Sequence, residues 1–284
     1  MSDLHVFGAS GAVGSWLIQR LRAEQRSAIA WSRSIVAHPQ DTDGPISWRS
    51  CDLYNDGAAS FATSIVSAGP LDAFAGWLAR IQTPQLGRVI ALSSMSIEAK
   101  RDSADGPERN LAARLRSAEQ QLRDTCNVRG IGWTILRPTL IWGAARDRSL
   151  SSLYSVGRRY GLVPVPRVDG GLRQPVHAAD VADACLSSMV CARSIGAVIP
   201  VAGAEQLPVA EMWMRVASAA QARCLRAPLW LMLAGCGILG ARGPALRAAL
   251  LRWHADQIAD SGIASAVIPN WRARGFAPTP ADFS

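Results

Sequence analysis

Short apolar runs alternate with longer helical patterns along the first two thirds of the chain. The apolar runs span four or five residues and are bounded by turn-forming residues, which is typical of buried strands. A helical pattern between consecutive runs is typical of parallel strands joined by crossover helices. The predicted strands are residues 3–7, 27–31, 46–49, 63–67, 88–92, 133–137 and 197–200, and the predicted helices are 13–24, 71–80, 107–126 and 179–190.

The pattern changes near Ala202, beyond which the chain is mainly helical and contains several tryptophans. We therefore expect an α/β fold, with a doubly wound parallel sheet and a small, mainly helical C-terminal lobe. The sheet domain is predicted to comprise residues 1–143 and 174–201, and the smaller, substrate-binding lobe residues 144–173 and 202–284. Ligands of open α/β sheets bind beyond the carboxyl ends of the strands, so the site is expected there.

The sequence GASGAVG follows the first predicted strand and opens the first predicted helix, which is the context that a dinucleotide-binding loop requires. Gly8 permits the tight turn, Gly11 lets the backbone approach the pyrophosphate, and Gly14 lets the helix pack closely on the strand. The helix N-terminus then presents unpaired N–H groups to the phosphates. These features predict a Rossmann-type domain whose cofactor-binding loop consists of Gly8, Ser10, Gly11, Ala12, Val13 and Gly14.

The end of the second strand holds Ser32 and Arg33, where an NAD-selective protein carries an acidic residue for the ribose hydroxyls. A carboxylate would repel a 2′-phosphate, whereas a guanidinium can hold it with two charge-assisted hydrogen bonds. The sequence therefore favours NADP(H) over NAD(H). The alternative is that Arg33 is a solvated loop cation, which leaves the selectivity open.

Two further segments are expected to border the cofactor. Asp52 and Leu53 follow the third strand and are placed to border the adenine ring, although Asp at a strand end is also a common turn former. Ala68, Gly69 and Pro70 follow the fourth strand, where Gly69 allows a close backbone approach. A plain strand-to-helix turn, with Pro70 near the first helical position, explains the same residues equally well.

Composition narrows the functional classes. Hydrophobic residues make up 49% of the 284, enough to bury a core, and the net charge of +8 is spread along the chain without the basic block of a nucleic-acid-binding arm. The six cysteines show neither a Cys-x-x-Cys pair nor His partners at zinc spacing, so no metal site is predicted. The uncharged stretch between Arg226 and Arg242 is too short to span a bilayer. A β-like segment begins within four residues of Met1, which leaves no room for a signal peptide, so a cytoplasmic protein with a small-molecule substrate is expected.

Several motifs occur together in one order, namely GASGAVG, RVIALSS, WTILRPTLIWG, LRQPVHAADVADA and NWRARGFAP. With these motifs the chain resembles the extended and atypical short-chain dehydrogenases/reductases, especially bacterial NAD(P)-dependent epimerase/dehydratase-like proteins. The resemblance covers most of the chain. It implies an oxidoreductase or epimerase acting on a carbonyl or hydroxyl of a nucleotide sugar or other small metabolite, and a possible homodimer built through the helices at 71–80 and 107–126.

The resemblance assigns the hydroxyl that polarises the reacting oxygen to Ser94. Ser93 and Ser96 are neighbours that could share this task or act as loop caps. The tyrosine and lysine that the family carries on the next helix are replaced here by Leu111 and Leu115. The usual acid and base are therefore missing, although carbonyl chemistry at neutral pH needs a placed proton donor or acceptor.

Lys100 is the candidate substitute. It is the single lysine of the chain, and it follows Ser94 by six residues on the segment that leaves the fifth strand. Lysine can titrate near neutrality in a suitable environment, and arginine cannot. The alternative is an ordinary surface lysine on a chain that binds the cofactor without redox turnover, as a cofactor sensor, an assembly partner, or an isomerase or cyclase using the same pocket.

Arginines are the expected anchors for an anionic substrate. In the family that the chain resembles, the position matching Arg173 in LRQPVHAAD holds the diphosphate of a nucleotide sugar, and a planar guanidinium suits that task. Arg146 and Arg148 add charge near the same mouth, or are simple surface cations. Arg137 and Pro138 resemble the family's cofactor-bordering pair after the sixth strand and are expected to be structural first.

Overall fold

The computed structural model describes residues 4–33, 44–55, 63–82, 84–101, 103, 105–145, 150–235, 247 and 250–283. It divides into two compact units, of which the first comprises Met1–Thr139, Ala178–Val201 and Asp260–Arg272, and the second Leu140–His177, Ala202–Ala259 and Ala273–Ser284. The expected division placed 260–272 in the smaller lobe, and here it groups with the first unit. The reason lies in two hydrogen bonds: Trp271 Nε1 donates to Asp180 O (2.7 Å), and the Cys191 thiol donates to Val267 O (3.3 Å).

The first unit is built on one seven-stranded sheet. Its strands are β1 (Leu4–Phe7), β2 (Ala28–Ser32), β3 (Ile46–Ser50), β4 (Ser64–Ser67), β5 (Arg88–Leu92), β6 (Gly132–Pro138) and β11 (Ala197–Val201). All neighbours are parallel, in the order β11-β6-β5-β4-β1-β2-β3. The predicted doubly wound α/β fold is thus confirmed. The strand order reverses between β1 and β4, which is where ligands of such sheets bind.

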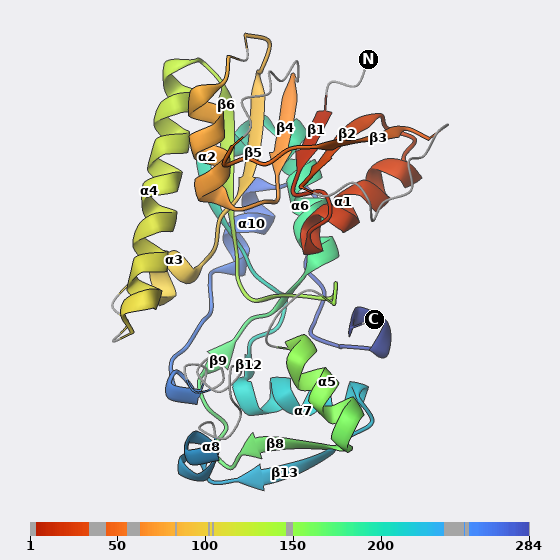
Figure 1. Ribbon diagram of the computed structural model, residues 1–284, viewed down its shortest axis with the longest axis vertical. Helices are drawn as coiled ribbons and strands as arrows, with labels where there is room; N and C mark the ends of the chain where they lie inside the picture. The colour runs from red at the N-terminus through yellow and green to blue at the C-terminus, as the bar shows by residue number, and fades with distance from the viewer. Residues whose placement is uncertain are drawn as a thin grey trace. The chain divides into compact units, whose positions relative to one another are not determined.

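Helices cover both faces of this sheet (Figure 1). They are α1 (Ala12–Ala23), α2 (Leu71–Arg80), α3 (Ser96–Ala99), α4 (Gly106–Val128), α6 (Ala178–Val190) and α10 (Ser261–Val267), with a 3-10 helix at Ala192–Ser194. On one face α2 and α4 lie side by side, and Phe7, Trp31 and Trp77 form part of the apolar core beneath them. On the other face α1 packs against α6, and Arg20 Nε pairs with Asp183 Oδ1 at 2.8 Å.

The second unit combines helices with short strands. Among its described residues are α5 (Leu150–Tyr160), α7 (Val209–Ala219) and α8 (Leu229–Gly235), the strands β7 (Ile141–Trp142), β8 (Leu162–Pro166), β9 (Leu172–Arg173), β10 (Val176–His177), β12 (Leu207–Pro208) and β13 (Arg223–Ala227), and a 3-10 helix at Pro280–Phe283. The strands form three two-stranded sheets, β7–β10, β9–β12 and β8–β13. Two of the tryptophans beyond Ala202, Trp213 and Trp253, lie in the core of this unit and meet edge to face at 5.1 Å. In the described part of the chain, no helix is both long and apolar enough to cross a membrane.

Candidate nucleotide-binding and catalytic site

The glycine-rich loop lies between the carboxyl end of β1 and the start of α1, beside the turn that follows β4. Gly8 adopts a left-handed conformation with φ of +70°, and a Cβ atom there would lie 2.5 Å from the backbone nitrogen of Gly69. A Cβ on Gly14 would collide with Gly8 O, so only glycine lets α1 start this close to β1. The expected roles of these two glycines in the turn and in the helix–strand packing therefore match the geometry.

Gly11 stands at the N-cap of α1, with φ of −75° and ψ of 177° and no side chain capping the helix. Its own N–H donates to Gly8 O at 2.8 Å, which closes the turn. Ala12 is the first residue of the helix, and Val13 turns its side chain into the core. Gly11 therefore does not cap the first-turn N–H groups of α1 with a side chain, and uncapped N–H groups are what anion binding at a helix N-terminus uses.

Ser32 and Arg33 stand at the end of β2, and Ser32 contacts the glycine-rich loop. Ser10 Oγ and Ser32 Oγ share a hydrogen bond of 2.9 Å, which ties the loop to β2. The next residue, Arg33, is exposed, and its backbone carbonyl accepts a hydrogen bond from Ser50 Oγ at 3.4 Å. The β2 end therefore presents two hydroxyls and a guanidinium, and no carboxylate stands among these residues.

The segments after β3 and β4 close around the same loop. The Asp52 carboxylate accepts hydrogen bonds from Tyr54 N (3.1 Å) and Asn55 Nδ2 (2.7 Å), so this aspartate forms the turn that its position also predicted. Leu53 is buried, and its Cδ1 lies 3.7 Å from where a Cβ of Gly69 would stand. Ala68 N donates to Phe7 O at 2.9 Å. Pro70 is the N-cap residue of α2, as the turn interpretation expected.

Two serine hydroxyls at neighbouring strand ends have no hydrogen-bond partner in the described part of the chain. They belong to Ser67, the last residue of β4, and to Ser93, which directly follows β5, and both oxygens are buried. Buried hydroxyls are normally hydrogen-bonded, so two buried hydroxyls without a partner at the carboxyl ends of neighbouring strands need an explanation. The sequence points to Ser93 and to the Ser-Ala-Gly-Pro segment that contains Ser67, but it assigns no role to the Ser67 hydroxyl itself.

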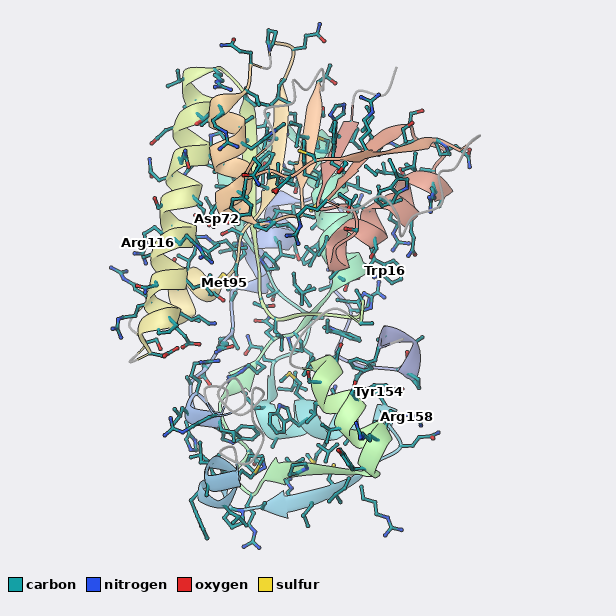
Figure 2. All side chains as sticks on the ribbon, viewed as in Figure 1. Trp16, Asp72, Met95, Arg116, Tyr154 and Arg158 are labelled. Carbon is teal, nitrogen blue, oxygen red and sulfur yellow. The ribbon has the colours of Figure 1, made fainter. Side chains whose placement is uncertain are left out.

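The predicted catalytic residues lie along the turn from β5 into α3. Ser94 Oγ accepts a hydrogen bond from Ser96 N at 3.1 Å, a local capping contact, and Met95 stands between them (Figure 2). Lys100, at the C-terminal end of α3, directs its ammonium to the buried Glu108 of α4, with Nζ 3.3 Å from Oε1. Within the described residues, Lys100 is therefore paired with Glu108, and Ser94 and Lys100 do not contact each other.

No titrating pair replaces the expected tyrosine and lysine on α4. Leu111 and Leu115 occupy those two positions half-buried, and Leu115 packs against the apolar core of the first unit. The tyrosines lie elsewhere. Tyr154 of the second unit stacks on Phe283 with ring centroids 4.5 Å apart, and Tyr160 is exposed. The acid–base position of the family is thus apolar in this chain.

Arg137, near the C-terminal end of β6, pairs with two glutamates. Its Nε and Nη2 hold both oxygens of Glu119 at 2.9 and 2.7 Å, and its Nη1 reaches Glu98 at 3.0 Å. Glu119 is completely buried. The hydrogen bond and charge of Glu119 raise the pKa of Arg137, and Glu98 contributes less. This side chain therefore locks β6 to α4, and neighbouring Pro138 fixes the β5–α3 turn by accepting a hydrogen bond from Met95 N at 3.0 Å.

Arg173, the expected substrate anchor, is buried in the second unit. Its Nη1 donates to Leu172 O (3.0 Å) and to Ala255 O, and its Nη2 donates to Arg252 O (3.1 Å). Burial, with a smaller contribution from the charge of Arg252, lowers the pKa of Arg173 to about 10. The guanidinium is thus engaged by backbone carbonyls. Arg146 and Arg148 lie outside the described residues. In the described part of the chain, no group of three His, Cys, Asp or Glu could hold a metal ion.

Solved structures share the fold of this chain. No family model matches the sequence, and no curated protein matches it. The structure of MoeE5 in complex with UDP-glucuronic acid and NAD matches with a TM-score of 0.70 at 18% identity, over 96% of this chain and 94% of that one. A nucleoside-diphosphate-sugar epimerase from Staphylococcus aureus matches at 0.67 and 14% identity, over 100% and 99%. A dTDP-glucose 4,6-dehydratase from Bacillus anthracis in complex with NAD matches at 0.62 and 12% identity, over 80% and 85%.

The parallel sheet and the glycine loop define a protein with a Rossmann-type fold. More narrowly, the chain has the fold of solved nucleotide-sugar epimerases and dehydratases, which confirms at the level of fold the resemblance that its motifs carry. At 18% identity or less, the likeness speaks for the fold and leaves cofactor, substrate and activity to be argued from the residues of this chain.

Proposed function

We propose that the first unit binds NADP(H) and that the protein is an NADP-dependent oxidoreductase or epimerase of the atypical short-chain dehydrogenase type. The observation that carries the proposal is the loop from Gly8 to Gly14, where the left-handed Gly8, the uncapped N-terminus of α1 and the close Gly14 form a cradle for a pyrophosphate. Three matching structures bear on the substrate class: MoeE5 is in complex with UDP-glucuronic acid and NAD, and the other two proteins are a nucleoside-diphosphate-sugar epimerase and a dTDP-glucose 4,6-dehydratase.

The residues present fit a nicotinamide dinucleotide along the strand ends. The hydroxyls of Ser67 and Ser93 are buried without partners, and a bound ligand would supply the hydrogen bonds that they lack. At the adenosine end, the exposed Arg33 beside Ser32 suits a 2′-phosphate, which favours NADP(H) over NAD(H). When bound, the nicotinamide supplies hydride transfer.

The protein's own part in the chemistry is to bind, orient and move a proton. We assign the polarising hydroxyl to Ser94, with Ser96 as its neighbour on α3, and the proton relay to Lys100 or a water molecule. For Lys100 to serve, its ammonium has to leave Glu108, from which it is 3.3 Å away. Arg173 stays our proposed anchor for the anionic part of the substrate, together with Arg146. For Arg173, this role requires release of the carbonyls that it holds.

Cofactor selectivity is tested by calorimetric titration of the cofactor-stripped protein with NADPH and with NADH. We expect NADPH to bind more tightly, and Arg33→Ala to weaken NADPH by roughly tenfold or more while leaving NADH unchanged, since only NADPH carries the 2′-phosphate. Arg116→Ala is the matched control, because Arg116 is an exposed arginine on the outer side of α4 (Figure 2). Equal losses in both variants, or equal affinity for both nucleotides, would contradict the selectivity.

A second candidate function is a protein that binds NADP(H) without redox turnover. The observation in its favour is the apolar pair Leu111 and Leu115 at the acid–base position, together with the Lys100–Glu108 ion pair. The two functions separate when the absorbance of NADPH is followed during incubation with carbonyl substrates and nucleotide sugars. Turnover that falls in both Lys100→Ala and Ser94→Ala supports the enzyme. NADPH binding with no turnover of any substrate supports the sensor, the assembly partner or the non-redox isomerase.

A further inference from the structure

Helix α8 of the second unit is apolar on both of its sides. It contains none of the residues that we assign to nucleotide or substrate binding. Leu229, Met232 and Leu233 pack against the core of the unit. Trp230 and Leu231 are turned outward, with 69% and 51% of their surfaces exposed. Single exposed leucines are ordinary on protein surfaces. A helix that has no polar side, however, is expected to bury its outer side against a further apolar partner.

The ribbon of β8 and β13 continues this apolar surface. Helix α8 begins two residues after β13 and packs against β8. Val163 and Val165 of β8 point into the core, so the alternate positions of the ribbon face away from it. Leu162 and Leu225 stand at such positions and are 39% and 52% exposed. The exposed apolar residues therefore come from three elements that contact one another or follow directly in the chain, namely β8, β13 and α8.

Most of the charged side chains around these residues are arginines. Arg223 on β13 and Arg167 directly after β8 are both exposed. From Met212 to Ala255 the chain contains arginines but neither Asp nor Glu. One acidic side chain lies nearby, since Asp169 stands 3.9 Å from Arg226. We call the set Leu162, Arg167, Arg223, Leu225, Trp230 and Leu231 the Trp230 surface.

We propose that the Trp230 surface docks the protein peripherally on an anionic lipid bilayer. Tryptophan is favoured at the boundary between headgroups and acyl chains, and neighbouring leucines can bury their side chains there. Arginines beside such a patch interact with anionic headgroups, so apolar burial and charge act together. A second copy of the chain is a poorer occupant, because a self-complementary contact brings the arginines of the two copies together.

The test is co-sedimentation of the full chain with vesicles of pure phosphatidylcholine and with vesicles that also contain about 30% phosphatidylglycerol, an anionic lipid. We expect binding to the mixed vesicles only, and release at about 0.5 M salt, where surface charges are screened. Trp230→Ser/Leu231→Ser abolishes binding. Arg223→Gln, which keeps the apolar residues, weakens it about fivefold, the effect of one cation at an anionic surface.

The matched control is Val128→Ser/Val190→Ser, which removes two exposed apolar side chains from the first unit and should leave vesicle binding unchanged. Circular dichroism shows whether each variant keeps the wild-type fold. The proposal is overturned if the wild type does not sediment with the mixed vesicles, or if it sediments equally well without Trp230 and Leu231. It is also overturned if the wild type self-associates in sedimentation velocity and the double variant does not, since the surface then serves a second copy.

Discussion

At the scale of single residues, the centre of β1 contains a buried histidine that is neutral at physiological pH. His5 Nδ1 accepts a hydrogen bond from Trp31 Nε1 at 3.2 Å. Burial, and to a smaller extent the nearby charge of Arg49, lowers the pKa of His5 from 6.5 to about 4. Because burial favours the neutral form of this imidazole, the folded state is sensitive to acid.

The resulting prediction concerns stability between pH 6.5 and 4. In this window the unfolded chain takes up a proton at His5 and the folded chain does not, so the free energy of unfolding falls as the pH falls, by roughly 1–3 kcal/mol. His5→Asn, which can still accept the Trp31 hydrogen bond, should remove that part of the pH dependence. Urea unfolding at a series of pH values measures it. His254→Asn, at an exposed histidine, should keep the wild-type slope, and equal slopes in all three proteins would refute the assignment.

A second prediction at this scale concerns the ion pair at the end of β6. Glu119→Gln leaves the buried part of Arg137 without its counter-ion and should lower the free energy of unfolding by about 2–4 kcal/mol. Glu98→Gln removes the other carboxylate, which is half exposed, and should cost under about 1 kcal/mol. Denaturant unfolding of the two variants decides. If both variants lost the same free energy of unfolding, the buried Glu119 contact would be no more stabilising than the exposed Glu98 contact, and the prediction would be wrong.

At the scale of elements, the β1–α1 turn depends on glycine for two reasons at once, conformation and space. Gly8 and Gly130 have nearly the same φ, +70° and +66°, but a Cβ at Gly130 would meet nothing within 4 Å, whereas one at Gly8 would meet the turn after β4. Gly130→Ala should therefore cost only the left-handed strain, about 1 kcal/mol. Gly8→Ala should cost more than about 2 kcal/mol and abolish NADPH binding.

Thermal unfolding and NADPH titration of the two variants check this prediction, with Gly130→Ala as the matched control. If Gly8→Ala bound NADPH like the wild type, the close approach of the loop to the β4 turn would have no part in the site.

Long apolar elements were predictable from the sequence, and short ones were not. The seven strands of the large sheet match their predicted ranges to within one or two residues, because each is a buried apolar run between turn residues. Two-residue strands such as β9 and β12 show no periodicity, and prolines in β8 hide that strand. The glycine loop was predictable because its tight turn and close packing leave no room for a Cβ atom, so the sequence must have glycine at these positions. The Lys100–Glu108 and Arg137–Glu119 pairs were not, since they join segments that only the fold brings together.

At the scale of the whole molecule, the sheet unit is assembled from three stretches of the chain. The last stretch, Asp260–Arg272, returns from the second unit, and its α10 packs against β11. The sequence placed this stretch in the smaller lobe because helices follow one another there without a strand. Only tertiary contacts of Trp271 and Val267 reveal its membership. A contact made by so short a segment leaves no pattern in the sequence.

Oligomeric state also belongs to this scale. The resemblance implies a homodimer through α2 and α4. The side of α4 that faces solvent in the single chain is polar, with Arg116 and Gln120 exposed. Such a dimer stays a prediction. Sedimentation velocity at several protein concentrations measures it, and a mass of one chain throughout would contradict it.

The most direct measurement of the central claim is calorimetric titration of the cofactor-stripped protein with NADPH, alongside Gly11→Trp. The claim is that the loop from Gly8 to Gly14 holds the pyrophosphate of NADP(H). We predict saturable binding by the wild type and none by Gly11→Trp, because an indole on the N-cap residue of α1 fills the space that the phosphates need. Absence of NADPH binding by the folded wild-type protein, or equal binding by Gly11→Trp, would contradict the claim.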